Sequence, residues 1–182
     1  AGNQFDDFLR QADKIIRDVL FSVGDTIETK KQLNEVVRAL RVELGPVYTG
    51  YTDLLIDDLT SLADTETPWN VNALSRGVEV DVSAPSTGQA IAAAISRPMT
   101  GGSTAALLRP FLKSFTPSQI EKVENNVIAG FYEGQTTQQI ARGIRGTKKN
   151  QFKDGVLITT DRAAKTMART AVNHVATQAR QV

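Results

Sequence analysis

Apolar residues repeat at helical spacing through the first third of the chain, and this periodicity restricts the fold more than any other feature of the sequence. In residues 5–23 they recur at i, i+3, i+4 and i+7, which predicts an amphipathic helix of about five turns that ends at Gly24. A second pattern covers residues 33–62 and keeps its phase through Gly45-Pro46. It predicts one long helix kinked at the proline, or two helices stacked end to end. Residues 1–65 are therefore expected to fold into an elongated helical hairpin.

The character of the sequence changes after this hairpin, and residues 66–115 are expected to form a connector. Residues 65–76 have the composition of a loop, and residues 77–83 alternate in the manner of a short strand. Residues 86–96 are rich in alanine and predict a short helix. Residues 97–104 contain proline and paired glycines, which are typical of a flexible connector.

Two helix starts are predicted in residues 116–182 from a repeated capping signal. In a capping box, a threonine side chain accepts a hydrogen bond from the backbone three residues later, and a glutamine at that position bonds back. Thr116 with Gln119 and Thr136 with Gln139 both have the required spacing. We expect a helix after each threonine.

The last twenty-six residues form a helical pattern without glycine or proline. Residues 155–160 are expected to form a short strand or an extended lead-in, with Thr160 as the cap of this helix. One face of the helix consists mostly of alanine, which favours close packing against other helices, with Arg169 and Asn173 as anchors of local polar contacts. Because the pattern has no stop signal, we expect the natural polypeptide to continue.

These elements predict a mainly α chain. We expect an elongated helical arm over residues 1–65, a connector with a short strand and short helices over residues 66–115, and a compact α-rich region over residues 116–182. At most one or two short strands are expected in the whole chain, and the third region is expected to be truncated at its C-terminus.

The order of segments in the third region resembles a known family. "GQTTQQIARGIRG", a linker and "LITTDRAAKTMARTAVNHVATQAR" are similar to the Mu F-like head-morphogenesis family of bacteriophage minor head proteins, in which an isoleucine-alanine helix precedes an "ARTxxN" helix. The matching residues are Ala168, Arg169, Thr170 and Asn173. This chain departs from the family at Ala171, where an acidic residue often follows the Arg-Thr pair.

The resemblance implies a minor structural protein inside the phage head, near the portal, that assists head assembly and DNA packaging or ejection. Its implied partners are the portal protein and packaged double-stranded DNA, with the major capsid protein as a further candidate and self-association as an option. Assembly would take place in the host cytoplasm. The first alternative is a helical scaffolding or regulatory module that binds a protein partner outside a virion. A second alternative is an enzyme whose active site lies in a C-terminal part beyond this sequence.

Positive charge gathers near the C-terminus of the chain. From Arg142 onward there are nine basic and two acidic residues, although the net charge of the chain is +1. A basic segment of this kind is suited to DNA phosphates, in a contact that does not depend on base sequence. We expect a mobile loop that carries the candidate DNA-backbone residues Arg142, Arg145, Lys148, Lys149 and Lys153.

A partner surface is expected on the second helix of the hairpin. Its apolar stripe runs for about nine turns, and the first helix covers about half of that length. The uncovered remainder predicts contact with the portal protein or a second copy. The candidate residues are Tyr48, Tyr51, Leu55 and Leu59.

Several kinds of site are not expected. The chain has no cysteine and one histidine, His174, which we expect on a helix surface, and this excludes a zinc ribbon or a His-rich metal site within one chain. Residues 143–150 lack the residue order of a Walker loop, and Asp53 and Asp57 lack further metal ligands. No apolar run approaches the roughly 20 residues that span a bilayer. We expect no catalytic residue, cofactor or metal, and no enzymatic activity.

Overall fold

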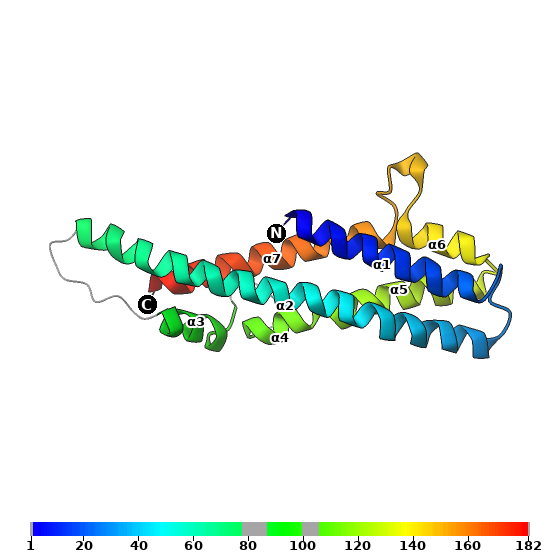
Figure 1. Ribbon diagram of the computed structural model, residues 1–182, viewed down its shortest axis with the longest axis horizontal. Helices are drawn as coiled ribbons and strands as arrows, with labels where there is room; N and C mark the ends of the chain where they lie inside the picture. The colour runs from blue at the N-terminus through cyan, green and yellow to red at the C-terminus, as the bar shows by residue number, and fades with distance from the viewer. Residues whose placement is uncertain (1, 78–86, 100–105, 182) are drawn as a thin grey trace. The chain divides into compact units, whose positions relative to one another are not determined.

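The computed structural model describes residues 2–77, 87–99 and 106–181, and within these ranges the chain is mainly α with no strand (Figure 1). The elements in chain order are α1 (Gly2–Ser22), α2 (Lys30–Gly77), α3 (Thr87–Ser96), α4 (Leu108–Lys113), α5 (Phe115–Tyr132), α6 (Thr137–Arg145), the 3₁₀ turn η1 (Lys148–Asn150) and α7 (Val156–Gln181). The predicted mainly α fold is confirmed.

The chain groups into two compact units. Unit 1 comprises residues 1–52 and 114–165, and unit 2 comprises residues 53–113 and 166–182. The division falls inside α2 and inside α7, so each of these helices contributes residues to both units.

In unit 1, α1 and the first part of α2 run antiparallel and form a helical hairpin (Figure 1). Gly24 follows α1 with a φ of 94°, a left-handed conformation that glycine adopts without strain. Aromatic contacts join the two helices, because the rings of Phe5 and Phe8 lie 4.4 Å and 5.8 Å from the ring of Tyr51, between centroids. The predicted end of the first helix and its pairing with the second are confirmed.

The helix α6 packs against both α1 and α5. Its N-terminus has the predicted capping box. The backbone N–H of Gln139 donates to Thr136 Oγ1, and the backbone N–H of Thr136 donates to Gln139 Oε1. Thr137 fastens this start to the end of α1: its amide donates to the Asp25 carbonyl at 2.9 Å and its hydroxyl to the Gly24 carbonyl at 2.8 Å. The chain thus returns to the α1–α2 turn from more than a hundred residues away.

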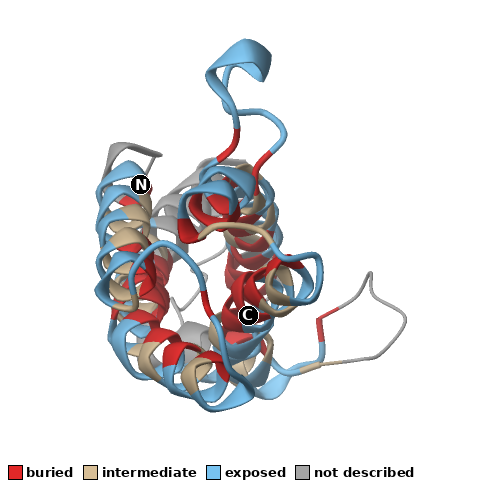
Figure 2. Ribbon diagram, turned by 90° about the vertical axis from the view of Figure 1, so that its right-hand side faces the viewer, coloured by how far each residue is buried: buried red, intermediate tan, exposed pale blue. Residues whose placement is uncertain are grey.

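The core of unit 1 is formed by the inward sides of its helices, while the outward sides are exposed (Figure 2). An apolar stripe on each helix produces this pattern, because burial of apolar area stabilises the fold. The largest fully buried side chains of this unit are Ile16, Leu20, Val36, Leu40, Leu44, Tyr48, Val123, Val127, Ile140 and Ile144.

A bidentate ion pair links α2 to α5 in unit 1. Arg41 Nε and Nη2 donate to the two carboxylate oxygens of Glu124 at 2.9 Å and 2.8 Å. The Glu124 carboxylate is buried, and its bonds to Arg41 raise the pKa of the guanidinium above its usual value. The pair therefore neutralises a charge inside the unit.

In unit 2, two polar contacts hold α3 and the residue after it to α7. His174 Nε2 lies 2.8 Å from the Ala94 carbonyl oxygen, and Arg97 Nη1 donates to Gln178 Oε1 at 2.9 Å. The expected surface position of His174 is wrong, because its side chain is buried against α3. The buried Ala94 carbonyl requires a hydrogen-bond donor, and the His174 imidazole supplies it.

Of the two forms predicted at Gly45-Pro46, the structure shows the single long helix, and α2 also continues through a segment that was predicted to be a loop. It passes Gly45-Pro46 as one helix, and it also includes residues 65–76, so the loop predicted there is wrong. Gly45 has no Cβ to clash with the proline ring, which removes the usual restriction on a residue before proline.

Two other helix starts also differ from prediction. The helix α5 begins at Phe115 with Ser114 as its N-cap residue, so Thr116 lies inside the first turn instead of capping it. The helix α7 begins at Val156, and the predicted strand or lead-in at 155–160 is wrong. Thr160 is buried within α7 and its hydroxyl donates to the Val156 carbonyl one turn earlier, which satisfies it inside the helix.

Predictions for the connector fall partly outside the described residues. The alanine-rich helix at 86–96 is confirmed as α3. The strand candidate at 77–83 lies outside the described residues, apart from Gly77 at the end of α2. Most of the flexible connector at 97–104 also lies outside them.

Candidate nucleic-acid interface

A ten-residue loop, Gly146–Gly155, projects from unit 1 between α6 and α7, and we name it the basic loop (Figures 1 and 2). Glycine is required where its two ends meet. Gly146 has a φ of 95°, and a Cβ on Gly155 would overlap the backbone of Arg145 and Gly146. Both glycines are buried and pack closely where the two ends of the loop meet.

Asp154 organises the basic loop through three hydrogen bonds. Its carboxylate accepts from the Thr147 amide at 2.8 Å, from the Thr147 hydroxyl at 2.7 Å and from Asn150 Nδ2 at 2.8 Å. These bonds, with the one to the Thr147 hydroxyl foremost, lower the pKa of Asp154 from 3.8 to about 2. The basic loop follows α6, as predicted. It is a turn whose conformation is fixed by the Asp154 carboxylate.

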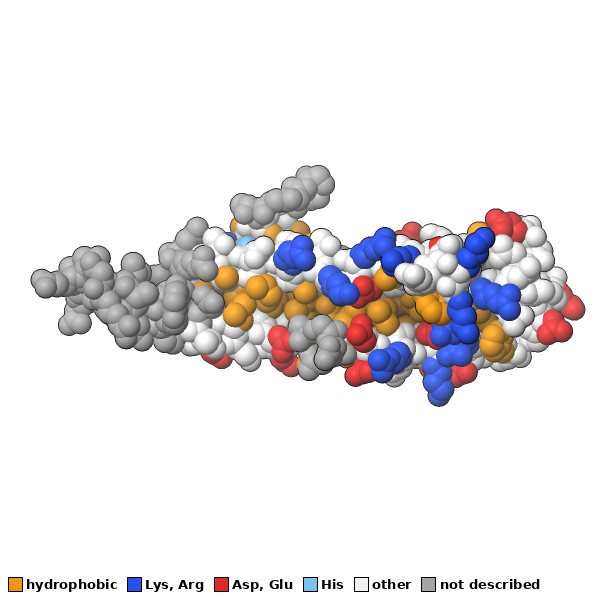
Figure 3. Space-filling view, turned by 90° about the horizontal axis from the view of Figure 1, so that it is seen from above, with side chains coloured by type: hydrophobic (Ala, Val, Ile, Leu, Met, Phe, Trp, Pro, Cys, Tyr) orange, Lys and Arg blue, Asp and Glu red, His pale blue; other side chains and the backbone are white. Residues whose placement is uncertain are grey.

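The five predicted DNA-backbone residues are brought together by α6 and the basic loop. Arg142 and Arg145 lie in the last turn of α6, where helix carbonyls favour cations, and Lys148 and Lys149 lie in η1. With Lys153, all five are exposed. Figure 3 looks onto the side from which the loop projects, and Lys and Arg side chains gather over the loop and the end of α6.

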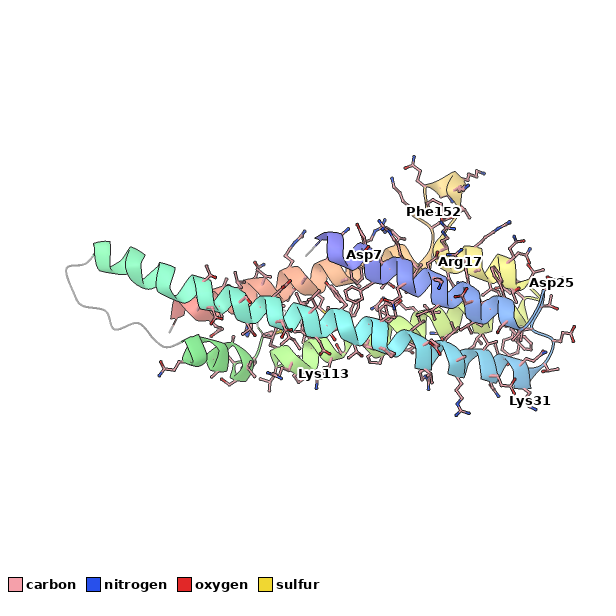
Figure 4. The ribbon with its side chains drawn as sticks, viewed as in Figure 1. Asp7, Arg17, Asp25, Lys31, Lys113 and Phe152 are labelled. Atoms are coloured by element: carbon pink, nitrogen blue, oxygen red, sulfur yellow. The ribbon has the colours of Figure 1, made fainter. Side chains whose placement is uncertain are left out.

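Arg145 is held from two sides. Its guanidinium carbon lies 5.0 Å from the centre of the Phe152 ring, which is a cation–π contact. Its Nε lies 3.9 Å from Asp13 Oδ2 on α1, and the same carboxylate oxygen lies 3.0 Å from Arg17 Nη2. Figure 4 labels Phe152 on the loop and Arg17 on α1. These contacts fix the orientation of an exposed cation.

An open pocket of about 440 Å³ lies at the junction of α6 and the basic loop. We name it the loop pocket, and its lining residues are Arg142, Arg145, Gly146, Thr147, Lys148 and Phe152. Three of them are cations and none is acidic. An electropositive concavity of this kind can accept an anionic group.

Sequence reasoning identified the cations but missed the residues that position them. Phe152 and Asp154 are close to the cations in sequence, and the pairing of Asp154 with Thr147 and Asn150 is a local side chain–backbone pattern that could have been proposed. Asp13 lies on a different helix, and no local pattern connects it to Arg145.

The four predicted partner residues do not form a surface. Tyr48, Tyr51, Leu55 and Leu59 are each at most 6% exposed, so the exposure on which their proposed role depended is wrong. The Phe115 ring lies 6.1 Å from Tyr48 and 5.8 Å from Tyr51, between centroids, and burial raises the pKa of Tyr48 to about 12. Leu59 lies in unit 2 beside residues of other helices that line a small apolar cavity. Phe115 covers Tyr48 and shares the cover of Tyr51 with α1, while residues of α3, α4 and α7 lie around Leu59, and the hairpin pattern alone does not reveal these later segments.

Among the described residues, no cluster of three or more His, Cys, Asp or Glu side chains has a metal-binding arrangement. The described helices also include none with the length and apolar character needed to cross a membrane. Comparisons with protein-family models, with curated proteins and with solved structures found no match.

Proposed function

We propose that this chain is a minor structural protein of a phage head, located inside the capsid near the portal, where it assists head assembly and DNA packaging or ejection. The proposal starts from the resemblance of residues 116–182 to Mu F-like head-morphogenesis proteins. Its expected partners are the portal protein and packaged DNA, with the major capsid protein as a further candidate.

The observation that carries the proposal is the exposure of the polar residues that match the family pattern on α7. Arg169, Thr170 and Asn173 are exposed, and none forms a side-chain hydrogen bond or ion pair within the described part of the chain. The local polar contacts expected for Arg169 and Asn173 are therefore absent there. Core packing does not account for the presence of these exposed polar side chains. They are therefore available to bind a partner.

Mass spectrometry of purified DNA-filled heads, from the phage whose genome encodes the chain, tests the proposal. We expect the chain in these heads at low copy number beside the portal protein. Deletion of its gene is expected to reduce the yield of infectious particles. Absence of the chain from purified heads would overturn the proposal.

A pair of variants tests the motif itself. Arg169→Ala/Asn173→Ala is expected to reduce incorporation into heads and to leave the melting temperature nearly unchanged, because both side chains are exposed. Arg162→Ala/Thr166→Ala is the matched control, with two exposed residues of α7 at the same spacing outside the motif. Equal incorporation of the two variants would show that the motif has no special role.

The second candidate is a helical scaffolding or regulatory module that binds a protein outside a virion. Tyr132 is largely exposed and Phe21 about half exposed in unit 1, and large aromatic side chains are favourable contacts in protein interfaces. Recovery of the chain in a soluble complex and not in heads would favour this candidate.

A further inference from the structure

We propose that the loop pocket is a preformed site for the phosphodiester backbone of duplex DNA, with Arg142, Arg145 and Lys148 as its cationic ligands. The inference rests on the proposed function, because packaged DNA is the source of these phosphates. It goes further by separating three residues of the basic cluster from Lys149 and Lys153, which do not line the pocket.

Two of the three cations that line the pocket have no acidic partner within the described part of the chain, and the third, Arg145, has Asp13 at 3.9 Å. Arg142 and Lys148 form no ion pair among the described residues. Asp154 is the acidic residue of the basic loop, but its carboxylate is engaged by Thr147 and Asn150 and does not line the pocket. An incoming phosphate therefore meets cations without a competing anion in the pocket wall.

The geometry of Arg145 suits a phosphate. Asp13 approaches Arg145 at Nε, and the guanidinium carbon lies over the Phe152 ring. At 3.9 Å this approach is no hydrogen bond, and the terminal nitrogens Nη1 and Nη2 form the fork that binds phosphate oxygens in a bidentate manner.

The pocket is also ordered before a ligand arrives. Asp154 fixes Thr147 beside Lys148, and Phe152 restricts Arg145. The Arg145 side chain is already positioned and loses less conformational entropy on binding, so its phosphate contact is stronger than one with a freely rotating lysine. Lys149 and Lys153 are expected to contribute only through screened, long-range attraction.

Fluorescence anisotropy with a labelled duplex, using the full chain, compares two variants that each remove two charges from the cluster. Arg142→Gln/Lys148→Gln is expected to weaken binding about tenfold or more, since each charge-assisted contact contributes substantially. Lys149→Gln/Lys153→Gln, the matched control, is expected to weaken it less than about threefold. Circular dichroism checks that both variants keep the parent's melting temperature. Equal losses in the two variants would overturn the site and leave a diffuse contact with DNA.

A second measurement uses inorganic pyrophosphate as the probe. We expect it to shift the Thr147 and Lys148 amide resonances and to compete with the duplex. Absence of these shifts while the duplex still binds would overturn the pocket but not the DNA contact. Shifts without any duplex binding would overturn the assignment of DNA as the ligand. Mass spectrometry of purified heads tests the proposed function separately. Its result therefore does not depend on whether this site binds phosphate.

Discussion

Asp154 has a structural role that its exposed position in a basic loop does not suggest. Its carboxylate accepts three hydrogen bonds, and these bonds hold the loop that carries Lys148 and Lys149. Ionised carboxylate accepts such bonds better than the protonated acid, which is why the pKa is lowered. The conformation of the basic loop should therefore depend on this one charge.

The pH dependence of the loop follows from the lowered pKa. A carboxyl group whose pKa is lower in the folded state stabilises that state above its ordinary value, here 3.8, and the contribution is lost as the pH falls through about 2. We expect the Thr147 amide resonance to titrate with a midpoint near pH 2. In Asp154→Asn this titration should disappear. A midpoint at or above 3.8 in the parent would contradict the hydrogen-bonded role of Asp154.

Asp13 is expected to weaken DNA binding by Arg145. Its carboxylate lies 3.9 Å from Arg145 Nε, and a negative charge at this distance reduces the local positive potential. Asp13→Asn should tighten duplex binding by roughly two- to fivefold, measured by anisotropy at low salt. Asp7→Asn is the control, because Asp7 lies on the same helix and pairs with Arg10 (Figure 4). The same change in both variants would indicate a general charge effect.

At the scale of residues, sequence reasoning succeeded where the relevant partners are close in the chain. The Thr136–Gln139 capping box and the cationic cluster were both predictable for this reason. Asp13 and the buried position of His174 were not, because each depends on a neighbour that a different helix supplies.

At the scale of elements, α2 shows that proline does not always end a helix. Its residues continue past Pro46, whose missing N–H leaves the Val42 carbonyl without its helical donor. Val42 is exposed, so water can reach this part of the helix. The helix is maintained by its buried stripe, which packing stabilises more than local propensity.

Pro46→Ala should stabilise the chain, because it restores one backbone donor and removes a ring that crowds the preceding turn. We expect an increase of about 1–3 kcal/mol in the free energy of unfolding, measured by urea denaturation. Pro117→Ala is the matched control, since Pro117 is also exposed but lies in the first turn of α5, where proline is well tolerated. A loss of stability in Pro46→Ala would mean that the proline has a favourable role that the helix geometry does not reveal.

The contact between α5 and α6 depends on a glycine. A Cβ on Gly130 would lie 2.5 Å from Ile140 Cγ1, and Ile140 is fully buried. Gly130→Ala should therefore destabilise the chain by about 1–3 kcal/mol, because the core must shift to admit the methyl group. Gly143→Ala is the control on α6, where the nearest atom is the end of the Asn126 side chain at 3.3 Å. Unchanged thermal stability in Gly130→Ala would contradict the close packing of these helices.

Helix starts were predicted less well than helix faces. Thr116 and Thr160 both lie inside helices, because the chain adopts helical structure before the capping residues that the sequence suggests. Apolar spacing specifies which side of a helix is buried. The first residue of a helix depends on how the preceding segment packs, and this is not a local property.

At the scale of the whole molecule, the contacts group the chain differently from the predicted order of segments. The division into domains at residues 1–65, 66–115 and 116–182 remains a prediction. The compact units instead combine residues 1–52 with 114–165, and residues 53–113 with 166–182. Periodicity reveals helices, but the return of α6 to the end of α1 depends on tertiary contacts such as those of Thr137.

The contact with DNA is the claim from which the role of the basic loop follows, and the salt dependence of duplex binding by the full chain tests it most directly. If the three cations of the loop pocket each neutralise one phosphate, log K should fall with log salt at a slope of about −2.7, near −0.9 for each phosphate. The slope should be the same for duplexes of unrelated sequence, because phosphate contacts do not read bases. Negligible affinity at low salt, or a slope near zero, would contradict the account.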